Sequence, residues 1–290
     1  MERRSRRILL LFIVPAMLLY LTFWILPVLM SFFYGLTDWK GLGSYEFIGL
    51  KNFKNLIRQG TLVNSLKNTV VYALVVVLWG NLQALILSLI LNMKLHARGV
   101  FRTLVYLPAL FSTIVAAFLW SYVYAPYYGL ISEVLKLLGS TWVPNLLGTS
   151  ATALIAVAFV ETWRSSGTMT IIYLAGLQNI PDDVIEAAKI DGCTSWQSTR
   201  LIKVPMISNT IMINVMLGLI NGFKSFDYVF ALTGGGPGTS SNTLMYSIYK
   251  MAFMESQFGK AEAMAACAFV FILVISISVL SILKKKEIEL

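Results

Sequence analysis

Six long apolar runs occupy most of this 290-residue sequence. Each run holds the roughly 20 residues that an α-helix needs to cross about 30 Å of hydrocarbon. The chain is 57% hydrophobic and 13% charged, whereas soluble domains average about 45–50% and about 25%. The sequence therefore predicts an all-α integral membrane protein with six transmembrane helices. They are expected at residues 8–34, 68–91, 103–124, 150 to about 174, 206 to about 231, and 260 or 261 to 283.

The first run follows a basic N-terminus and could be mistaken for a signal peptide. Signal peptides carry only about 7–15 apolar residues and end at small residues. This run is longer and has no such cleavage site, so a retained membrane helix is predicted. With the N-terminus inside, the predicted cytoplasmic segments hold 13 lysines and arginines, against 8 outside. Because positive charge concentrates in cytoplasmic loops, both termini are predicted to be cytoplasmic.

One polar stretch, residues 178–205, is too long for a simple turn between two membrane helices. A proline and two aspartates, at 181–183, suit the first turn of a short helix. An N–H in that turn has no hydrogen-bond partner within the helix, so proline loses nothing there, and acidic residues favour the positive end of the helix dipole. Gly192 is a plausible stop for that helix. Thr194 or Ser195 can cap a second helix, which Pro205 is expected to close. The stretch therefore predicts two short helices in the cytoplasm.

The spacing inside this stretch is diagnostic. Glu186-Ala187-Ala188 is followed by Asp191-Gly192, and Pro205 comes thirteen residues after Gly192. This pattern resembles the EAA motif of the membrane subunits of binding-protein-dependent ABC importers. Cys193 is a departure, because the family usually has alanine there; both residues are small.

Other segments are similar to the branch of that family that imports di- and oligosaccharides and glycerol phosphates. They are the segment 232–238 (LTGGGPG), then Tyr246, Tyr249 and Ala252-Phe253, and also Phe101-Arg102, Leu107-Pro108 and Asn68-Thr69. The resemblance runs from the first apolar run to the sixth. It implies a type I ABC importer permease fold, with residues 1–290 forming a single transmembrane domain.

The resemblance also implies an activity and partners. The chain would be a non-enzymatic permease that moves a carbohydrate by alternating access in a bacterial or archaeal plasma membrane. ATP and Mg would be bound by a separate ABC ATPase subunit, with no cofactor in this chain. The further partners implied are a second, homologous permease chain, in a hetero-dimer or a homodimer, and an extracytoplasmic solute-binding protein. Which sugar is carried stays open.

By resemblance, the polar stretch docks on the ATPase subunit and couples its closure to the membrane helices. The residues assigned to this coupling are Glu186, Ala187, Ala188, Asp191, Gly192 and Pro205. Their chemistry fits, because alanines admit a close partner backbone and a glutamate can form a charge-assisted hydrogen bond. The alternative is an amphipathic helix that lies on the lipid surface.

Two polar stripes flank this stretch and are candidates for the substrate path. The first is Glu161, Arg164, Ser165 and Thr168, and the second is Asn214, Gly218, Asn221 and Ser225. Ionisable groups in a membrane helix are costly and mark functional or paired positions. Neutral polar groups near Trp163, Phe223 and Tyr228 suit a sugar, which offers hydroxyls at its edge and an apolar face. Alternatively, Glu161 and Arg164 neutralise each other, and the second stripe holds helices together.

The glycine-rich segment Gly234, Gly235, Gly236, Pro237 and Gly238 is expected to form a tight extracytoplasmic turn on which the solute-binding protein docks. It lacks the preceding strand and the lysine of a phosphate-binding loop. The chain carries no nucleic-acid reader motif, and its cysteines, Cys193 and Cys267, have no metal or redox spacing.

Four competing functions remain. A permease for glycerol 3-phosphate or another small polar solute shares every motif above, and an amino-acid or phosphate importer is disfavoured by the glycine-proline segment. An intramembrane enzyme would need a nucleophile or histidine cluster, yet His96 is the only histidine. A sensor or scaffold would not need the EAA pattern.

Overall fold

The computed structural model describes residues 13–93 and 96–284. Within these residues the regular secondary structure is helical, apart from one isolated antiparallel bridge between Thr37 and Phe47. The expectation of an all-α protein is confirmed for this part of the chain. The arginines before the first apolar run, the first five residues of that run, Lys94, Lys285 and Lys286 lie outside the described residues.

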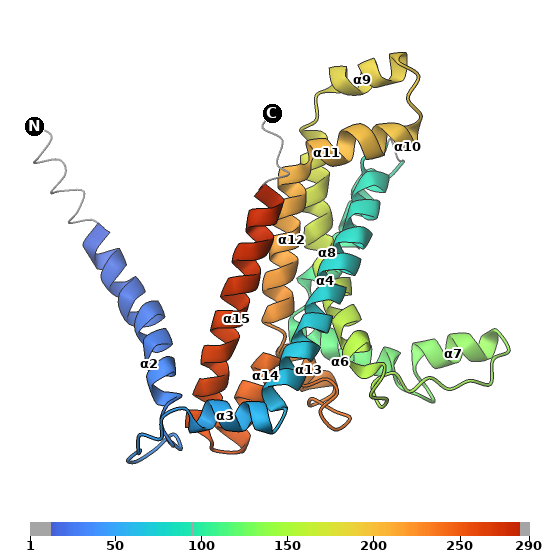
Figure 1. Cartoon of the computed structure of the whole chain (residues 1–290). Coiled ribbons are helices and arrows are strands. Elements are labelled where there is room, and N and C mark those ends of the chain that lie inside the picture. The colour runs from blue at the N-terminus through green and yellow to red at the C-terminus, as the bar shows by residue number, and fades with distance from the viewer. Residues whose placement is uncertain (1–12, 94–95, 285–290) are drawn as a thin grey trace, which may run out of the picture. The chain divides into compact units, whose positions relative to one another are not determined.

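Among residues 13–93 and 96–284, three helices are long and apolar enough to cross a membrane (Figure 1). They are Ile13–Tyr34, α4 (Thr61–Leu91), and Phe258–Leu283 within α15 (Phe258–Lys284). A π turn, η1 (Leu21–Ile25), interrupts the first of them, which ends as α2 (Leu26–Tyr34). Two bent helix pairs bring the count of spans to as many as five if each pair is one span.

The chain divides into two compact units. The first unit is Met1–Val63 with Ser247–Phe271, and it holds α2, α3 (Lys51–Arg58), η4 (Lys250–Met254) and the first part of α15. The second unit is Asn64–Tyr246 with Ile272–Leu290. It contains nearly all of α4 and every helix from α5 to α13, including α7 (Leu130–Leu137), and α14 (Leu244–Tyr249) begins in it.

The third apolar run does not form the uninterrupted helix that its sequence predicts. It is divided into α5 (Arg98–Tyr106), the 3₁₀ turn η2 (Leu107–Leu110) and α6 (Thr113–Val123), with a bend of 100° between η2 and α6. Pro108 lies at the start of η2, where its ring and missing N–H favour a break in a longer helix. Ser112 then caps α6, because its side chain accepts a hydrogen bond from the Val115 N–H at 3.3 Å.

The fifth apolar run is also broken, so the expected continuous helix over 206–231 is wrong. The structure has α12 (Ser208–Phe223) and a separate α13 (Asp227–Leu232). The helix Ser195–Met206 meets α12 at a bend of 72°. The bend lies at Ile207, whose φ of −96° and ψ of 21° are not helical.

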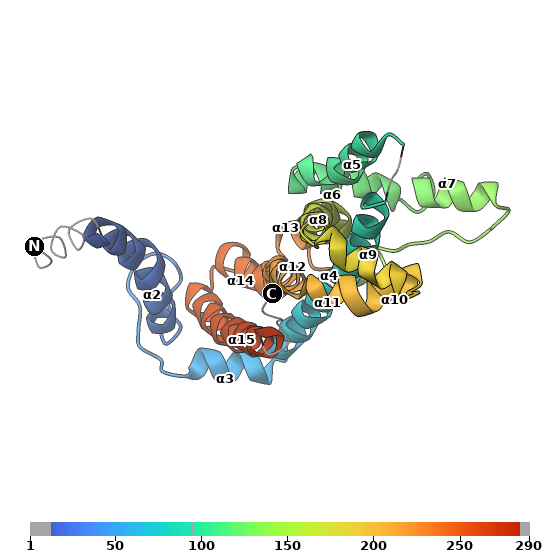
Figure 2. The same cartoon turned by 90° about the horizontal axis from the view of Figure 1, so that it is seen from above.

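The fourth apolar run forms α8 (Ala153–Gln178), the central helix of the second unit (Figure 2). α8 contacts α5, η2, α6, α12 and α13. Its 26 residues are enough to span a bilayer, but polar side chains in its middle lower its hydropathy, so it is not among the three clearly apolar helices. Neighbours approach it closely: a Cβ on Gly167 would lie 2.7 Å from the Val105 carbonyl oxygen, and one on Gly176 would lie 2.4 Å from Thr210 Oγ1.

Candidate functional site

Residues 178–205, called the elbow from here on, fold locally in the way their sequence predicts. Its first helix, α9 (Asp182–Ile190), ends in a Schellman motif. The Gly192 N–H donates to the Lys189 carbonyl at 3.1 Å, and the Cys193 N–H donates to the Ala188 carbonyl at 2.9 Å. Gly192 has a φ of +81° and open space around its Cβ position, so the left-handed backbone, rather than crowding, favours glycine there.

The second helix of the elbow runs through α10 (Ser195–Ser198), the π turn η3 (Thr199–Lys203) and α11 (Val204–Met206). The predicted cap at Thr194 is confirmed as a capping box. The Gln197 N–H donates to Thr194 Oγ1 at 3.3 Å, and the Thr194 N–H donates to Gln197 Oε1 at 2.8 Å. The second helix ends at Met206, one residue after Pro205, so its expected end is confirmed to within one residue. The π turn η3 ends two residues before Pro205, and its altered hydrogen-bond ladder accommodates a residue without an N–H.

The elbow presents both charged and apolar side chains to the outside. In Figure 1, α9 and α10 lie beyond the end of α8. Glu186, Ala187 and Asp191 are exposed, whereas Ala188 is only 5% exposed and packs within the chain. A partner could therefore approach Ala187 but not Ala188.

Three large apolar side chains on the elbow were not predicted as site residues. Ile190 is 86% exposed, Trp196 is 71% exposed and Leu201 is 63% exposed. Large apolar residues that are strongly exposed on a polar segment are candidates for contact with a partner protein. Their signal in the sequence is the presence of such residues in an otherwise polar stretch.

Hydrogen bonds connect Gln178, where the elbow begins, to α5, and connect α5 to the end of α4. Arg98 Nε donates to the Leu91 carbonyl at the end of α4 at 2.7 Å. With its amide oxygen toward the arginines, Gln178 at the end of α8 accepts from Arg98 at 3.0 Å and from Arg102 at 2.8 Å. A polar pocket of about 280 Å³ lies here, lined by Asn92, Arg98, Leu177, Gln178, Ile180, Asp182, Ile185 and Lys203. The ends of α4, α5 and α8 are thus joined where α9 begins.

The four residues of the predicted stripe on α8 differ in how far they are buried. Glu161 is 8% exposed and Ser165 is 7% exposed, and Ser165 Oγ donates to the Glu161 carbonyl at 2.8 Å. Arg164 is half-buried and Thr168 is exposed, so Thr168 does not share the burial of the others. Among the described residues, Glu161 and Arg164 form no ion pair within 4.0 Å.

Glu161 and Arg164 belong to a group of four side chains from three helices, called the polar cluster below. The other two are Tyr72 on α4 and Tyr228 on α13, which interact electrostatically with both charges. In the described part of the chain, Tyr72 Oη, Arg164 Nε and Tyr228 Oη are buried without a hydrogen bond of normal geometry. Buried polar groups are rarely left this way unless water or a ligand serves them. Tyr72 was not predicted, because its proximity to α8 is a long-range contact.

An aromatic group lies beside the polar cluster on α8. The ring of Trp163 stacks on Phe111 with centroids 6.1 Å apart and meets Trp120 edge-on at 5.6 Å. The indole N–H of Trp120 is buried and has no acceptor among the described residues. Aromatic faces and unpaired donors therefore lie close together on α6 and α8.

The predicted stripe on α12 lies largely in helix–helix contacts. Asn214 is fully buried, and its Nδ2 donates to the Met169 carbonyl of α8 at 3.1 Å. A Cβ on Gly218 would lie 3.2 Å from Val77 Cγ2 on α4. Asn221 is half-buried, and Ser225 is buried but lies beyond the end of α12, so the predicted stripe does not continue to it on one helix. For Asn214 and Gly218 this geometry fits the alternative role, in which small and amide residues hold helices together.

The glycine-rich segment forms a compact turn that is held by the start of α4. Gly235 requires glycine, because its φ is +80° and a Cβ would lie 1.8 Å from Asn242 Oδ1. Asn68 Nδ2 donates to the carbonyls of Thr239 at 3.0 Å and Asn242 at 2.9 Å. Thr69 Oγ1 accepts from the Leu244 N–H at 2.8 Å. These bonds give a physical reason for the Asn68-Thr69 pair, while Gly234 and Gly238 stay exposed.

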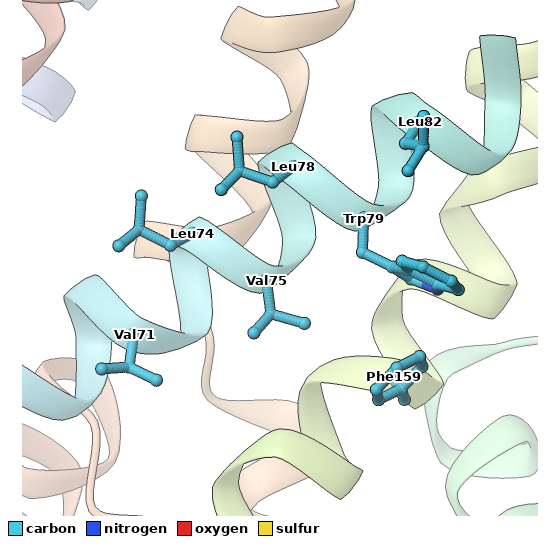
Figure 3. A pocket seen from close by; sticks show the side chains of 7 residues that line it. All are labelled: Val71, Leu74, Val75, Leu78, Trp79, Leu82 and Phe159. Atoms are coloured by element: carbon cyan, nitrogen blue, oxygen red, sulfur yellow. The ribbon is translucent and has the colours of Figure 1, made fainter.

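An apolar pocket of about 420 Å³ opens on α4 and α8 (Figure 3). It is lined by Val71, Leu74, Val75, Leu78, Trp79, Leu82 and Phe159. Trp79 on α4 and Phe159 on α8 meet with ring centroids 5.6 Å apart. Leu78 is 66% exposed, so this face offers apolar surface to lipid or to another apolar helix.

Within the described residues no group of three or more His, Cys, Asp or Glu could hold a metal ion.

Known proteins resemble the chain over nearly its whole length. The permease protein AmyD of the probable starch degradation products transport system of Thermoanaerobacterium thermosulfurigenes is 32% identical over 280 residues, 97% of this chain and 95% of AmyD. The permease protein UgpA of the sn-glycerol-3-phosphate transport system of Pectobacterium atrosepticum is 30% identical over 270 residues, 92% of this chain and 90% of UgpA.

Solved structures share the fold. A bacterial ABC transporter involved in the import of the acidic polysaccharide alginate matches with a TM-score of 0.83 at 22% identity, over 98% of this chain and 97% of that one. The expected ABC permease fold is therefore confirmed, and the chain is a multi-pass protein of the plasma membrane. Residues 80–285 match the model of the binding-protein-dependent transport system inner membrane component. The chain belongs to this family of inner-membrane transport components.

Proposed function

We propose that the chain is the permease subunit of an ATP-driven importer of di- or oligosaccharides. One observation carries the proposal: a single helix, α8, bears Glu161 and Arg164 in its middle and ends at Gln178, where the elbow begins. A force applied to the elbow would reach the polar cluster along one continuous helix. The names of the relatives, which are transport permeases, support a transporter rather than an enzyme.

The elbow is proposed as the docking site for a separate ATPase subunit. Glu186 and Asp191 supply exposed negative charge, and Ile190 and Trp196 supply exposed apolar area. Buried aromatic anchors with charges at the rim are typical of residues that dominate binding energy. The Schellman turn and the capping box fix both helices before the partner arrives, which lowers the entropic cost of docking.

The polar cluster is proposed as part of the substrate path. The buried polar groups of Arg164, Tyr72 and Tyr228, which lack hydrogen bonds of normal geometry, could serve sugar hydroxyls, and the aromatic group around Trp163 suits stacking on a pyranose face. An arginine without an ion pair also suits a phosphate, so glycerol 3-phosphate is the second candidate. The relative UgpA is named as the permease of an sn-glycerol-3-phosphate transport system.

The topology and the remaining partners belong to the same proposal. We infer six spans: the three long apolar helices, the bent pair Arg98–Leu110 with Thr113–Val123, α8, and α12. Both termini and the elbow would then lie in the cytoplasm. The turn at Gly234–Gly238 would then face outward and contact a solute-binding protein. The apolar pocket at Trp79 suits a second permease chain, as expected for a hetero-dimeric core.

The first test is co-purification of the detergent-extracted chain with its partners. An ATPase subunit and a second permease should accompany the wild type and should be lost from Glu186→Lys. Glu133→Lys on α7 is the matched control, because it makes the same charge reversal at an exposed residue away from the elbow. Retention of the ATPase by Glu186→Lys, or equal loss from both variants, would contradict the docking role of the elbow.

The second test identifies the substrate class. The complex and its binding protein, reconstituted in vesicles, should hydrolyse ATP faster with maltodextrins than without. Stimulation by glycerol 3-phosphate alone would replace the carbohydrate assignment and leave the coupling role intact. If the detergent-extracted chain co-purified with no ATPase subunit, both the importer assignment and the coupling role of the elbow would be contradicted.

A further inference from the structure

The amphipathic helix α3 carries a basic face that the transport proposal does not use. α3 (Lys51–Arg58) belongs to the first unit and lies crosswise to the first part of α15 in both views (Figures 1 and 2). Its inner face is anchored. Asn52 Nδ2 donates to the carbonyls of Gly35 at 3.0 Å and Thr37 at 2.7 Å, and Leu56 is fully buried.

The end of α3 is anchored as well. Lys260 Nζ, at the start of α15, donates to Gln59 Oε1 at 2.8 Å. Bonds at both ends of the helix leave little freedom to roll. The outer face of α3 is therefore presented in a fixed orientation.

That outer face gathers positive charge at helical spacing. Lys51, Lys54 and Arg58 are exposed and share one side of the helix at i, i+3 and i+7. They line a surface depression of about 440 Å³ together with Ile48, Leu50 and Asn55. No carboxylate lines it, and none of the three cations has an ion-pair or hydrogen-bond partner among the residues the structure describes.

Apolar side chains flank this basic face. Leu50 and Ile57 are each 59% exposed, and in the preceding loop Phe47 is 69% exposed and Leu42 is 90% exposed. A helix with basic and apolar residues exposed side by side is typical of segments that lie in the membrane interface. A soluble anion would need the charges but not the apolar rim.

We propose that α3 is an interfacial anchor that binds the phosphate of anionic phospholipid headgroups. Lys51, Lys54 and Arg58 hold the phosphate, while Ile48 and Leu50 contact the glycerol and the first methylenes of the acyl chains. Basic pockets at membrane surfaces bind anionic lipids in this way. The proposal is independent of the substrate path, which lies in the second unit.

The test measures binding of short-chain lipids to the delipidated, detergent-purified chain by thermophoresis. Dioctanoyl phosphatidylglycerol should bind at least about tenfold more tightly than dioctanoyl phosphatidylcholine, because each basic residue near an anionic headgroup contributes up to about fivefold. The triple variant Lys51→Gln/Lys54→Gln/Arg58→Gln should lose this preference. It keeps Asn52 and Leu56, so its elution volume should match that of the wild type.

The matched control is Lys40→Gln/Lys67→Gln/Lys136→Gln, which removes the same charge from exposed lysines outside the depression. It should keep the preference for phosphatidylglycerol. Equal loss in both triple variants would mean non-specific charge attraction and would overturn the proposal. Displacement of the lipid by inorganic phosphate at similar concentrations would identify a soluble-anion site, and unchanged binding by the α3 variant would exclude α3 altogether.

Discussion

Replacing Gly222 by alanine should destabilise the chain, because α12 and α4 touch at this residue. A Cβ on Gly222 would lie 2.6 Å from Ala73 Cα and 2.8 Å from Ala73 Cβ. Carbon atoms in contact normally lie about 3.5–4.0 Å apart, so the helices would have to separate by about 1 Å. Because the obstacle is backbone, no side-chain rotation relieves it.

The magnitude follows from two opposing effects. Overpacking of this kind costs about 3 kcal/mol at the upper end of its usual range, whereas alanine improves helix propensity over glycine by about 1 kcal/mol. The net loss in free energy of unfolding is therefore about 2 kcal/mol, which corresponds to a fall of about 4–8 °C in apparent melting temperature.

Gly218→Ala is the control on the same face of α12. Its Cβ would lie 3.2 Å from Val77 Cγ2 and 3.4 Å from Val77 Cα, so a shift of a few tenths of an ångström suffices and the cost and the propensity gain should nearly cancel. Both variants would be melted in detergent, with tryptophan fluorescence as the signal. Equal melting temperatures for Gly222→Ala and the wild type, or a larger loss for Gly218→Ala, would refute the packing of α12 on α4.

Three further predictions concern function. Gly192→Ala should lower substrate-stimulated ATPase activity more than Gly192→Asn does, because the left-handed backbone at φ +81° costs alanine about 1–2 kcal/mol and asparagine less; equal activities would mean that the turn does not limit coupling. Asn68→Leu leaves the Asn242 carbonyl without its donor, at a cost of about 1–3 kcal/mol, and should speed proteolysis within residues 233–243 while the helices stay intact; unchanged cleavage would speak against the role of Asn68. Tyr228→Phe removes a hydroxyl that interacts with Arg164 without a hydrogen bond of normal geometry, so the melting temperature should fall little while ATPase stimulation by sugar falls; full stimulation would remove Tyr228 from the substrate path.

The elbow could be predicted because its determinants are local. Gly192 and the Thr194–Gln197 capping box act on backbone groups within a few residues, so the sequence alone carries the information. The π turn before Pro205 could not be predicted in the same way. A π turn changes the hydrogen-bond ladder without a strong residue signature.

The breaks in the third and fifth apolar runs show a second limit. The hydropathy of a segment indicates whether its residues can lie in lipid. A straight helix and two helices that meet at 100° can have the same hydropathy, so the bend cannot be read from it. Pro108 lies within the third apolar run, but a proline alone does not tell whether the helix bends or by what angle. The two stripes show a third limit, since a polar or small residue on a helix face can line a cavity or touch a neighbour. The contacts of Asn214 with α8 and of Gly218 with α4 depend on residues far away in the sequence.

The shortness of α12 has a consequence for the bilayer around it. Its 16 residues rise about 24 Å, which is about 6 Å less than the thickness of an average hydrocarbon core. A helix that is too short for its membrane creates hydrophobic mismatch, and the lipid thins or water enters at its ends. If the proposed substrate path runs beside α12, a polar solute on that path would meet a dielectric barrier narrower than the membrane itself.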